Sequence, residues 1–118
     1  MRLSQHQRIF TKNIAKLIAY AYENGIELTF GEAYRTHEQQ LLYVHSGKSH
    51  TMNSNHLKRL AVDFNVFIKN NLTYKWEDIK PLGDYWETLH PNNRWGGDWN
   101  KNDIKDGFID TPHFEMNV

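Results

Sequence analysis

The amino-acid sequence predicts a single α+β domain, in which a small antiparallel sheet is flanked by helices. Helical periodicities alternate along the chain with short hairpin-like strand patterns, which is typical of this class. The 118 residues suit one domain of ordinary size, and the sequence contains no repeats, low-complexity tracts or linker. We therefore expect residues 1–118 to form one domain.

The first predicted element is a helix that ends at Asn24-Gly25, a common stop signal. Ser4 and Gln7 form a capping-box pattern at its start. Apolar residues then recur at helical spacing: Phe10, Ile14, Leu17, Ile18 and Ala21. Residues 26–30 alternate between apolar and polar side chains, which predicts a short strand.

A second helix is predicted from His37 to His45. Thr36 and Gln39 form another capping-box pattern, and Ser46-Gly47 ends the helix. Its apolar contacts are expected from Leu41, Leu42 and Val44. The polar residues 48–55 predict a loop.

The clearest strand covers residues 60–66. Its apolar side chains are Leu60, Val62, Phe64 and Val66, and they alternate with Ala61, Asp63 and Asn65. Because the apolar set should face the core, Asp63 is expected to point to the other side of the sheet.

The second half of the chain predicts a turn, a helix and a final strand. Asn70-Asn71 is typical of a turn between two strands. Pro81 suits the first turn of a third helix that runs to about Leu89. An aromatic turn at residues 95–99 precedes the last strand, predicted from Gly107 to Met116 with an interruption at Pro112.

Composition excludes several functions. Hydrophobic residues make up 39% and aromatics 14%, which argues against disorder. Lys plus Arg and Asp plus Glu both number 14, so the chain lacks the basic excess typical of nucleic-acid binders, and we expect no nucleic-acid partner. Without cysteine, a transition-metal site must use His and carboxylates.

The sequence also bears on localisation. No apolar run approaches the ~20 residues of a membrane-spanning helix, and the N-terminus has no apolar signal core. We expect synthesis in the cytoplasm without a signal peptide or membrane anchor. A substrate outside the inner membrane would then require another component to give access.

Three side chains are candidate metal ligands: His56, Asp63 and His113. In an extended C-terminal segment, His113 shares a face with Glu115, while Phe114 occupies the core side. A zinc hydrolase needs three protein ligands, an open position and a nearby carboxylate base, a role that Asp110 can fill. Spacing alone leaves open a surface histidine and a solvated aspartate, and no His-Glu-x-x-His helix is present.

Four segments resemble motifs of the M15 metallopeptidases. Residues 54–63, Ser-Asn-His-Leu-Lys-Arg-Leu-Ala-Val-Asp, resemble the family motif Ser-x-His-x-x-Gly-x-Ala-x-Asp. Residues 110–115 resemble its second motif, Asp-x-x-His-Phe-Glu. Residues 32–36 resemble its arginine-bearing strand end, and residues 95–97 resemble the turn before the last motif. The likeness covers nearly the whole chain in the family's order.

This resemblance implies a hedgehog/DD-peptidase-like fold and a role for each site residue. Zn²⁺ would be bound by His56, Asp63 and His113. Asp110 would take a proton from water and pass it to the leaving amine. Arg35 would stabilise an oxyanion or hold a substrate carboxylate, with a surface ion pair as the alternative. Ser54 would orient the substrate or the loop, or else make a turn bond to the backbone.

Two positions refine the resemblance. Arg59 stands where the family motif has Gly, which suggests a different turn or a backbone that does not need Gly. Asp110 is a shorter base than the Glu that the carboxypeptidase branch often has, which favours the endolysin branch.

Other side chains have weaker assignments. Glu115 would be the acceptor that supports His113. Trp95 and Trp99 are expected in the core rather than in the cleft. His50 is an option for substrate contact, although exposed loop histidines are common.

The resemblance implies a zinc-dependent peptidoglycan peptidase, and in particular a phage endolysin that cleaves the L-alanyl-D-glutamate bond of the stem peptide. Such an enzyme would act on the cell wall as a monomer, after a holin opens the membrane. The first alternative is a D-alanyl-D-alanine carboxypeptidase or dipeptidase of the same family. The second is a non-catalytic zinc-containing binding domain, as in hedgehog signalling proteins.

Overall fold

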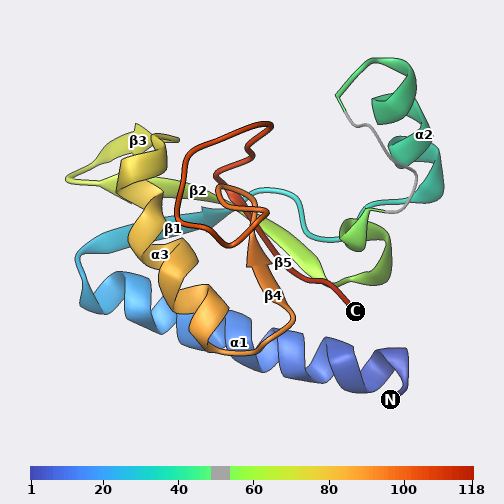
Figure 1. Ribbon diagram of the computed structural model, residues 1–118, viewed down its shortest axis with the longest axis horizontal. Helices are drawn as coiled ribbons and strands as arrows, with labels where there is room; N and C mark the ends of the chain where they lie inside the picture. The colour runs from blue at the N-terminus through green and yellow to red at the C-terminus, as the bar shows by residue number, and fades with distance from the viewer. Residues whose placement is uncertain (49–53) are drawn as a thin grey trace.

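The computed structural model describes residues 1–48 and 54–118, in which helices accompany one antiparallel sheet (Figure 1). The elements in chain order are α1 (Leu3–Glu23), β1 (Ile26–Phe30), α2 (His37–His45), the 3₁₀ helix η1 (Asn55–Lys58), β2 (Ala61–Ile68), β3 (Asn71–Thr73), α3 (Trp76–Thr88), β4 (Asn93–Trp95) and β5 (His113–Met116). The predicted α+β class is confirmed. No helix in the described ranges is long and apolar enough to cross a membrane.

Strand β2 is the centre of the sheet. The strand order is β1-β2-β5-β4, with β3 paired to the end of β2, and every pair is antiparallel. In the β2–β5 pair Asp63 lies opposite His113, and in the β4–β5 pair Arg94 lies opposite Glu115. These two registers bring together side chains that are far apart in the sequence.

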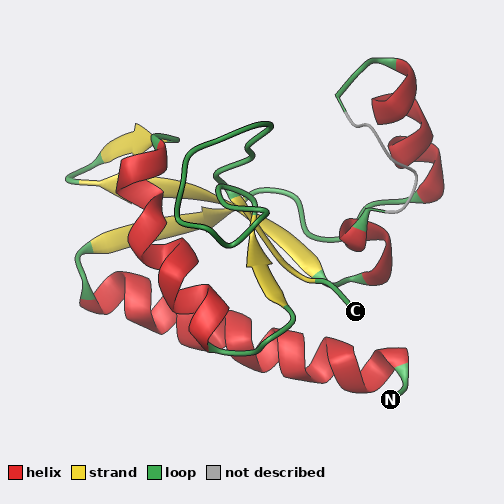
Figure 2. Ribbon diagram, in the orientation of Figure 1, coloured by secondary structure: helices red, strands yellow, loops and turns green. Residues whose placement is uncertain are grey.

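Helices α1 and α3 cover one face of the sheet and form the core with it (Figure 2). The predicted apolar face of α1 is confirmed, because Phe10, Leu17 and Ala21 are buried. The Phe10 ring meets the Trp86 ring of α3 edge to face, with centroids 5.5 Å apart. The predicted apolar set of β2 is buried too, which leaves the alternate side chains of β2, Asp63 among them, for the opposite face.

Helix α1 begins earlier than its predicted cap. Arg2 is the N-cap residue, and its backbone N–H donates to Gln5 Oε1 at 2.7 Å. The predicted Ser4–Gln7 capping box is therefore wrong, because Gln5 already occupies the position that caps the helix. The Gln7 side chain instead donates to the Lys58 carbonyl at 2.8 Å, which ties α1 to η1.

Helix α3 also begins earlier than predicted. It starts at Trp76, so Pro81 lies inside the helix rather than in its first turn. Glu77 and Asp78 occupy the first turn, where their charges favour the helix dipole. Proline's fixed φ is compatible with helical backbone, so Pro81 removes one hydrogen bond without ending α3.

Two further boundaries differ by small amounts. The β2–β3 turn is Lys69-Asn70, one residue before the predicted turn, and both residues have positive φ, as a two-residue hairpin requires. The last strand starts at His113, because Pro112 has no N–H to donate to a sheet.

Helix α2 has its predicted bounds but not its predicted contacts. Thr36 Oγ1 accepts a hydrogen bond from the Gln39 N–H at 3.1 Å, and the helix ends before Gly47. Leu41 and Leu42 are 47% and 62% exposed, so these two leucines do not make the expected apolar contacts, whereas Val44 is half-buried. The helix lies apart from α1 and α3 (Figure 1) and buries the polar Gln40 instead.

Candidate metal centre

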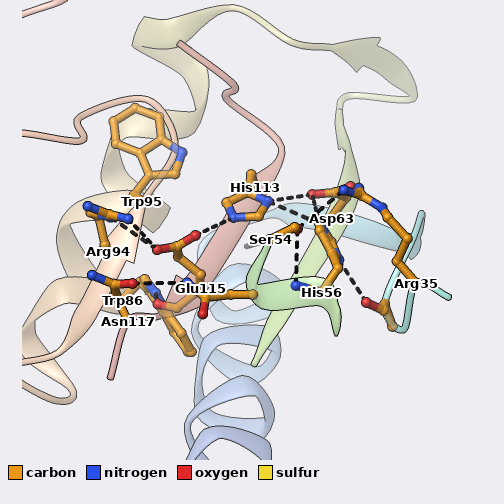
Figure 3. Close-up of polar contacts among 12 residues, drawn as sticks. Arg35, Ser54, His56, Asp63, Trp86, Arg94, Trp95, His113, Glu115 and Asn117 are labelled. Atoms are coloured by element: carbon orange, nitrogen blue, oxygen red, sulfur yellow. Dashed lines mark hydrogen bonds and ion pairs between the residues drawn. The ribbon is translucent and has the colours of Figure 1, made fainter. Parts of the chain in front are cut away.

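Three side chains converge on the face of the sheet opposite α1 and α3 (Figure 3). The β2–β5 register sets Asp63 beside His113, and η1 brings His56 to the same point. Asp63 Oδ1 lies 3.1 Å from His113 Nδ1 and 3.4 Å from His56 Nε2. The two facing ring nitrogens are 3.2 Å apart. The three predicted ligand residues therefore form a compact triangle of ligand atoms.

This triangle fits a zinc ion. With bonds of ~2.0–2.1 Å in tetrahedral geometry, neighbouring ligand atoms stand roughly 3.3–3.4 Å apart. The three observed separations, 3.1, 3.2 and 3.4 Å, are close to that spacing. Two imidazoles and one carboxylate are also a donor set that zinc takes in hydrolases, with one position left open. The residues can thus hold Zn²⁺.

His56 is oriented by the 3₁₀ turn that carries it. Ser54 Oγ accepts a hydrogen bond from the His56 backbone N–H at 3.3 Å, which caps the turn. The ring nitrogen Nδ1 lies 2.7 Å from the Ala33 carbonyl oxygen. Because a carbonyl only accepts, Nδ1 must carry the proton, and Nε2 presents its lone pair to the triangle.

His113 directs its other ring nitrogen to the triangle: Nδ1, where His56 directs Nε2. Its Nε2 lies 2.8 Å from Glu115 Oε1, so the Nε2–H donates to that carboxylate and Nδ1 faces Asp63. This is the acceptor role expected of Glu115. Arg94 in turn donates to Glu115 from Nε at 3.0 Å and from Nη2 at 2.8 Å.

The charges of the triangle are strongly coupled. Burial would raise the pKa of Asp63, but hydrogen bonds from His113 and His56 outweigh it and hold that pKa well below its usual range. Burial would lower the pKa of His113, but hydrogen bonds with Asp63 and Glu115 raise it to about 9. Without metal, His113 is therefore protonated at neutral pH, and a metal must displace that proton.

Asp110 lies in the same cleft, which has a volume of about 470 Å³. Its backbone N–H donates to the Gly96 carbonyl at 2.8 Å, and its carbonyl accepts from the His113 N–H at 3.1 Å. Among the described residues, none donates a hydrogen bond to the Asp110 carboxylate. Burial raises its pKa, partly countered by the charge of His113. A half-buried carboxylate with a raised pKa suits a general base.

Arg35 is held in the cleft by a network of side chains. Its Nε forms an ion pair with Glu32, and its Nη1 donates to Gln40 Oε1 at 2.7 Å and to Ser54 Oγ at 3.2 Å. The guanidinium lies 4.7 Å from the centroid of the Tyr43 ring. Within the described ranges no acceptor bonds to its Nη2, so that edge of the guanidinium has donors available in the cleft.

Ser54 makes the turn bond to the backbone that was considered for it, and it also bonds to Arg35. Its hydroxyl accepts from the His56 backbone, which is the turn bond, and from Arg35 in the cleft. The same oxygen therefore links the candidate ligand turn to the arginine.

Sequence reasoning missed several partners of the site. Glu32, Gln40 and Tyr43 all hold Arg35 or its ion-pair partner; Tyr43 OH donates to Glu32 Oε2 at 3.0 Å. The spacing of three residues between Gln40 and Tyr43 on one predicted helix was an available signal that they share a side. Arg94 had no such local signal, because its contact depends on strand register.

The two tryptophans divide between core and cleft. Trp95 is buried, as expected. Trp99 lines the cleft instead, with its ring centroid 5.3 Å from that of His113. The predicted substrate contact of His50 lies outside the described residues.

Arg59 has the left-handed backbone conformation that glycine favours. Its φ is 56°, in the left-handed region, where it follows η1. The expected change of turn is therefore wrong. The Arg59 guanidinium lies 4.2 Å from the Tyr34 ring centroid, a contact that offsets part of the strain.

The chain matches one protein family along most of its length. The family is described as phage L-alanyl-D-glutamate peptidase, and the match covers residues 3–117. A curated relative, the L-alanyl-D-glutamate peptidase of Listeria phage A118, is 38% identical over 106 residues. That match covers 86% of this chain and 34% of the relative, so the chain spans about a third of the relative's length.

Two solved structures share the fold. The Serratia marcescens L-Ala D-Glu endopeptidase ChiX matches with a TM-score of 0.66 and 23% identity, covering 99% of this chain and 87% of that one. The vancomycin resistance D,D-pentapeptidase VanY, an E175A mutant in complex with Zn(II), matches with a TM-score of 0.61 and 17% identity. That match covers 92% of this chain and 71% of VanY.

Proposed function

Because the chain belongs to the phage L-alanyl-D-glutamate peptidase family, we propose that it is a zinc-dependent peptidoglycan peptidase that hydrolyses the L-alanyl-D-glutamate bond of the stem peptide. The observation that carries the proposal is the triangle of His56, Asp63 and His113, with the Asp110 carboxylate in the same cleft. A ligand triangle alone would suit a binding domain, whereas an added carboxylate that accepts no hydrogen bond from the described residues suits hydrolysis.

Zinc held by the triangle would supply Lewis-acid chemistry, which polarises a peptide carbonyl and makes water more acidic. The chain's own residues do the rest. Asp110 accepts the proton of the attacking water and delivers it to the leaving amine of D-glutamate. Its raised pKa favours this exchange, because a base that binds its proton more tightly removes it more readily from water.

Arg35 stabilises the oxyanion or holds a substrate carboxylate. Glu32, Gln40 and Ser54 occupy its Nε and Nη1 donors and set the plane of the guanidinium. The Nη2 edge, which bonds to none of the described residues, can then donate in a fixed direction, and this suits either task. Ser54 acts with it, because its hydroxyl ties the arginine to the turn of His56.

The family membership also suggests the partners of the protein and its place of action. We expect a monomer that meets the stem peptide at the cell wall, to which a holin gives it access. A second candidate is a D-alanyl-D-alanine carboxypeptidase, which the fold shared with VanY supports. The presence of Asp110 argues against the non-catalytic alternative.

Digestion of purified peptidoglycan of known chemotype separates the candidates. Mass spectrometry of the products should find stem peptides that begin with D-glutamate, and glycan strands whose muramic acid residues keep a single L-alanine. Release of terminal D-alanine without those products would contradict the proposal. As a control for contaminating hydrolases, Asp110→Ala should bind zinc as the parent chain does and release product about 10²-fold or more slowly.

A further inference from the structure

We propose that Arg94 is a positioning residue for the metal centre, which acts through Glu115 to hold the His113 ring with Nδ1 toward Asp63 and His56. The inference rests on the proposed zinc site. It assigns a task to a side chain that no sequence motif singled out and that lies one strand away from the candidate ligands.

The register of β4 and β5 places Arg94 directly opposite Glu115 (Figure 3). Both donors of the arginine, Nε and Nη2, bond to the same oxygen, Glu115 Oε2, at 3.0 and 2.8 Å. The other oxygen, Oε1, accepts the Nε2–H of His113 at 2.8 Å, and the Asn55 side chain is a further donor to the same carboxylate. Because each oxygen has its own donor, the carboxylate cannot rotate without breaking contacts on both sides.

Burial makes this arrangement sensitive to loss of the arginine. Glu115 is 4% exposed, so water cannot readily replace a missing donor. A planar fork with two donors on one oxygen also fixes direction, which a single ammonium does not. Removing Arg94 should therefore let the Glu115 carboxylate shift toward new partners and loosen its hold on His113.

Arg94 has a second contact that must be separated from the first. Its guanidinium lies 4.9 Å from the Trp99 ring centroid, and the Trp99 ring lies 5.3 Å from that of His113. An effect of Arg94 could thus pass through Trp99 instead of Glu115. A double-mutant cycle distinguishes the two routes.

The experiment measures the zinc dissociation constant by chelator competition for the parent chain, Arg94→Met, Glu115→Gln and the double variant. Arg94→Met should weaken zinc binding by about 10-fold or more, as for other partners of ligand histidines. In Glu115→Gln, a single amide oxygen serves two donors, Arg94 and His113. When Arg94→Met is added to Glu115→Gln, zinc binding should become stronger, because Arg94 no longer competes with His113 for the one amide oxygen.

Arg8→Met is the matched control, since Arg8 is an exposed arginine on α1 whose bond among the described residues is to the Ser4 carbonyl of its own helix. It should leave zinc affinity unchanged. If Arg94→Met does not fold, Arg94→Lys replaces it, with a loss smaller than 10-fold. Cobalt substituted for zinc then reports the ligand geometry, and the visible spectrum of Arg94→Lys should differ from that of the parent chain.

Parent-like zinc affinity in Arg94→Met, or a parent-like spectrum and affinity in Arg94→Lys, would show a plain structural ion pair and overturn the inference. An equal loss in both backgrounds of the cycle would move the effect to Trp99 and also overturn it. A parent chain that binds no zinc would overturn the proposed function itself, so the two failures are distinguishable.

Discussion

Replacing Gly96 with alanine tests how closely the turn after β4 must approach the segment that carries Asp110 and His113. A Cβ at this position would lie 2.2 Å from the Asp110 carbonyl oxygen and 2.9 Å from His113 Cβ. An ordinary C···O contact is about 3.3 Å or more, so one side must move by about 1 Å. The contacts are backbone and Cβ atoms, which cannot rotate away. Overpacking of this kind costs about 1–3 kcal/mol of stability.

The same shift should reach the chemistry, because it moves the candidate base and a candidate ligand together. A misplacement of about 1 Å can cost about 100-fold in rate. The assay is hydrolysis of purified peptidoglycan at saturating zinc, with zinc affinity measured beside it. Gly107→Ala is the control: its φ is +63°, but an added Cβ meets nothing within 4 Å, so it should lose about 1 kcal/mol of stability and no activity. Parent-like activity and zinc affinity in Gly96→Ala would refute the reasoning.

Three other predictions follow from single residues. Asp110→Asn should keep zinc affinity while peptidoglycan hydrolysis falls by about 10²–10⁴-fold; a similar loss of zinc would mean that Asp110 supports the site rather than the reaction. Arg59→Gly should be more stable to urea than Arg59→Ala by about 1 kcal/mol, because both lose the Tyr34 contact but only alanine keeps the strain at φ 56°; the usual order, alanine above glycine, would count against the left-handed backbone. Burial lowers the pKa of His113, but its carboxylate partners raise it to about 9. The metal-free chain should therefore lose unfolding free energy as the pH rises from about 6.5 through 9, while zinc affinity increases over the same range; titration in EDTA and in zinc buffers checks both signs, and a flat profile in EDTA would contradict them.

Much of the fold was predictable from local patterns. The apolar repeat of α1, the alternation along β2 and the cap at Thr36 each reflect a periodicity or hydrogen bond made within a few residues. Predicted helix boundaries were wrong where a residue is compatible with two positions in a helix. Pro81 suits a first turn and also fits helical φ, and the start of α3 depends on the acidic residues before it.

Tertiary contacts were harder to predict. Leu41 and Leu42 are apolar residues on a helix, yet α2 packs through Gln40 and Tyr43 against the arginine network, so the leucines remain exposed. The sequence pattern of α2 does not show whether this helix packs on the sheet, as α1 and α3 do, or contacts Arg35 through its polar side chains.

The candidate site shows the same limit. His56, Asp63 and His113 were predictable as a set because ordered motifs contain them, whereas spacing alone also fitted ordinary surface residues. The β2–β5 register places Asp63 opposite His113 and so brings the two side chains together. Arg94 could not be predicted, because its bond to Glu115 exists only once β4 and β5 pair.

The central claim is that these three side chains form the zinc centre. Crystals grown with zinc and measured at the zinc absorption edge test it most directly. We predict one anomalous peak at about 2.0–2.2 Å from His56 Nε2, Asp63 Oδ1 and His113 Nδ1. A peak held by other side chains, or no peak in a chain that hydrolyses peptidoglycan, would contradict the account.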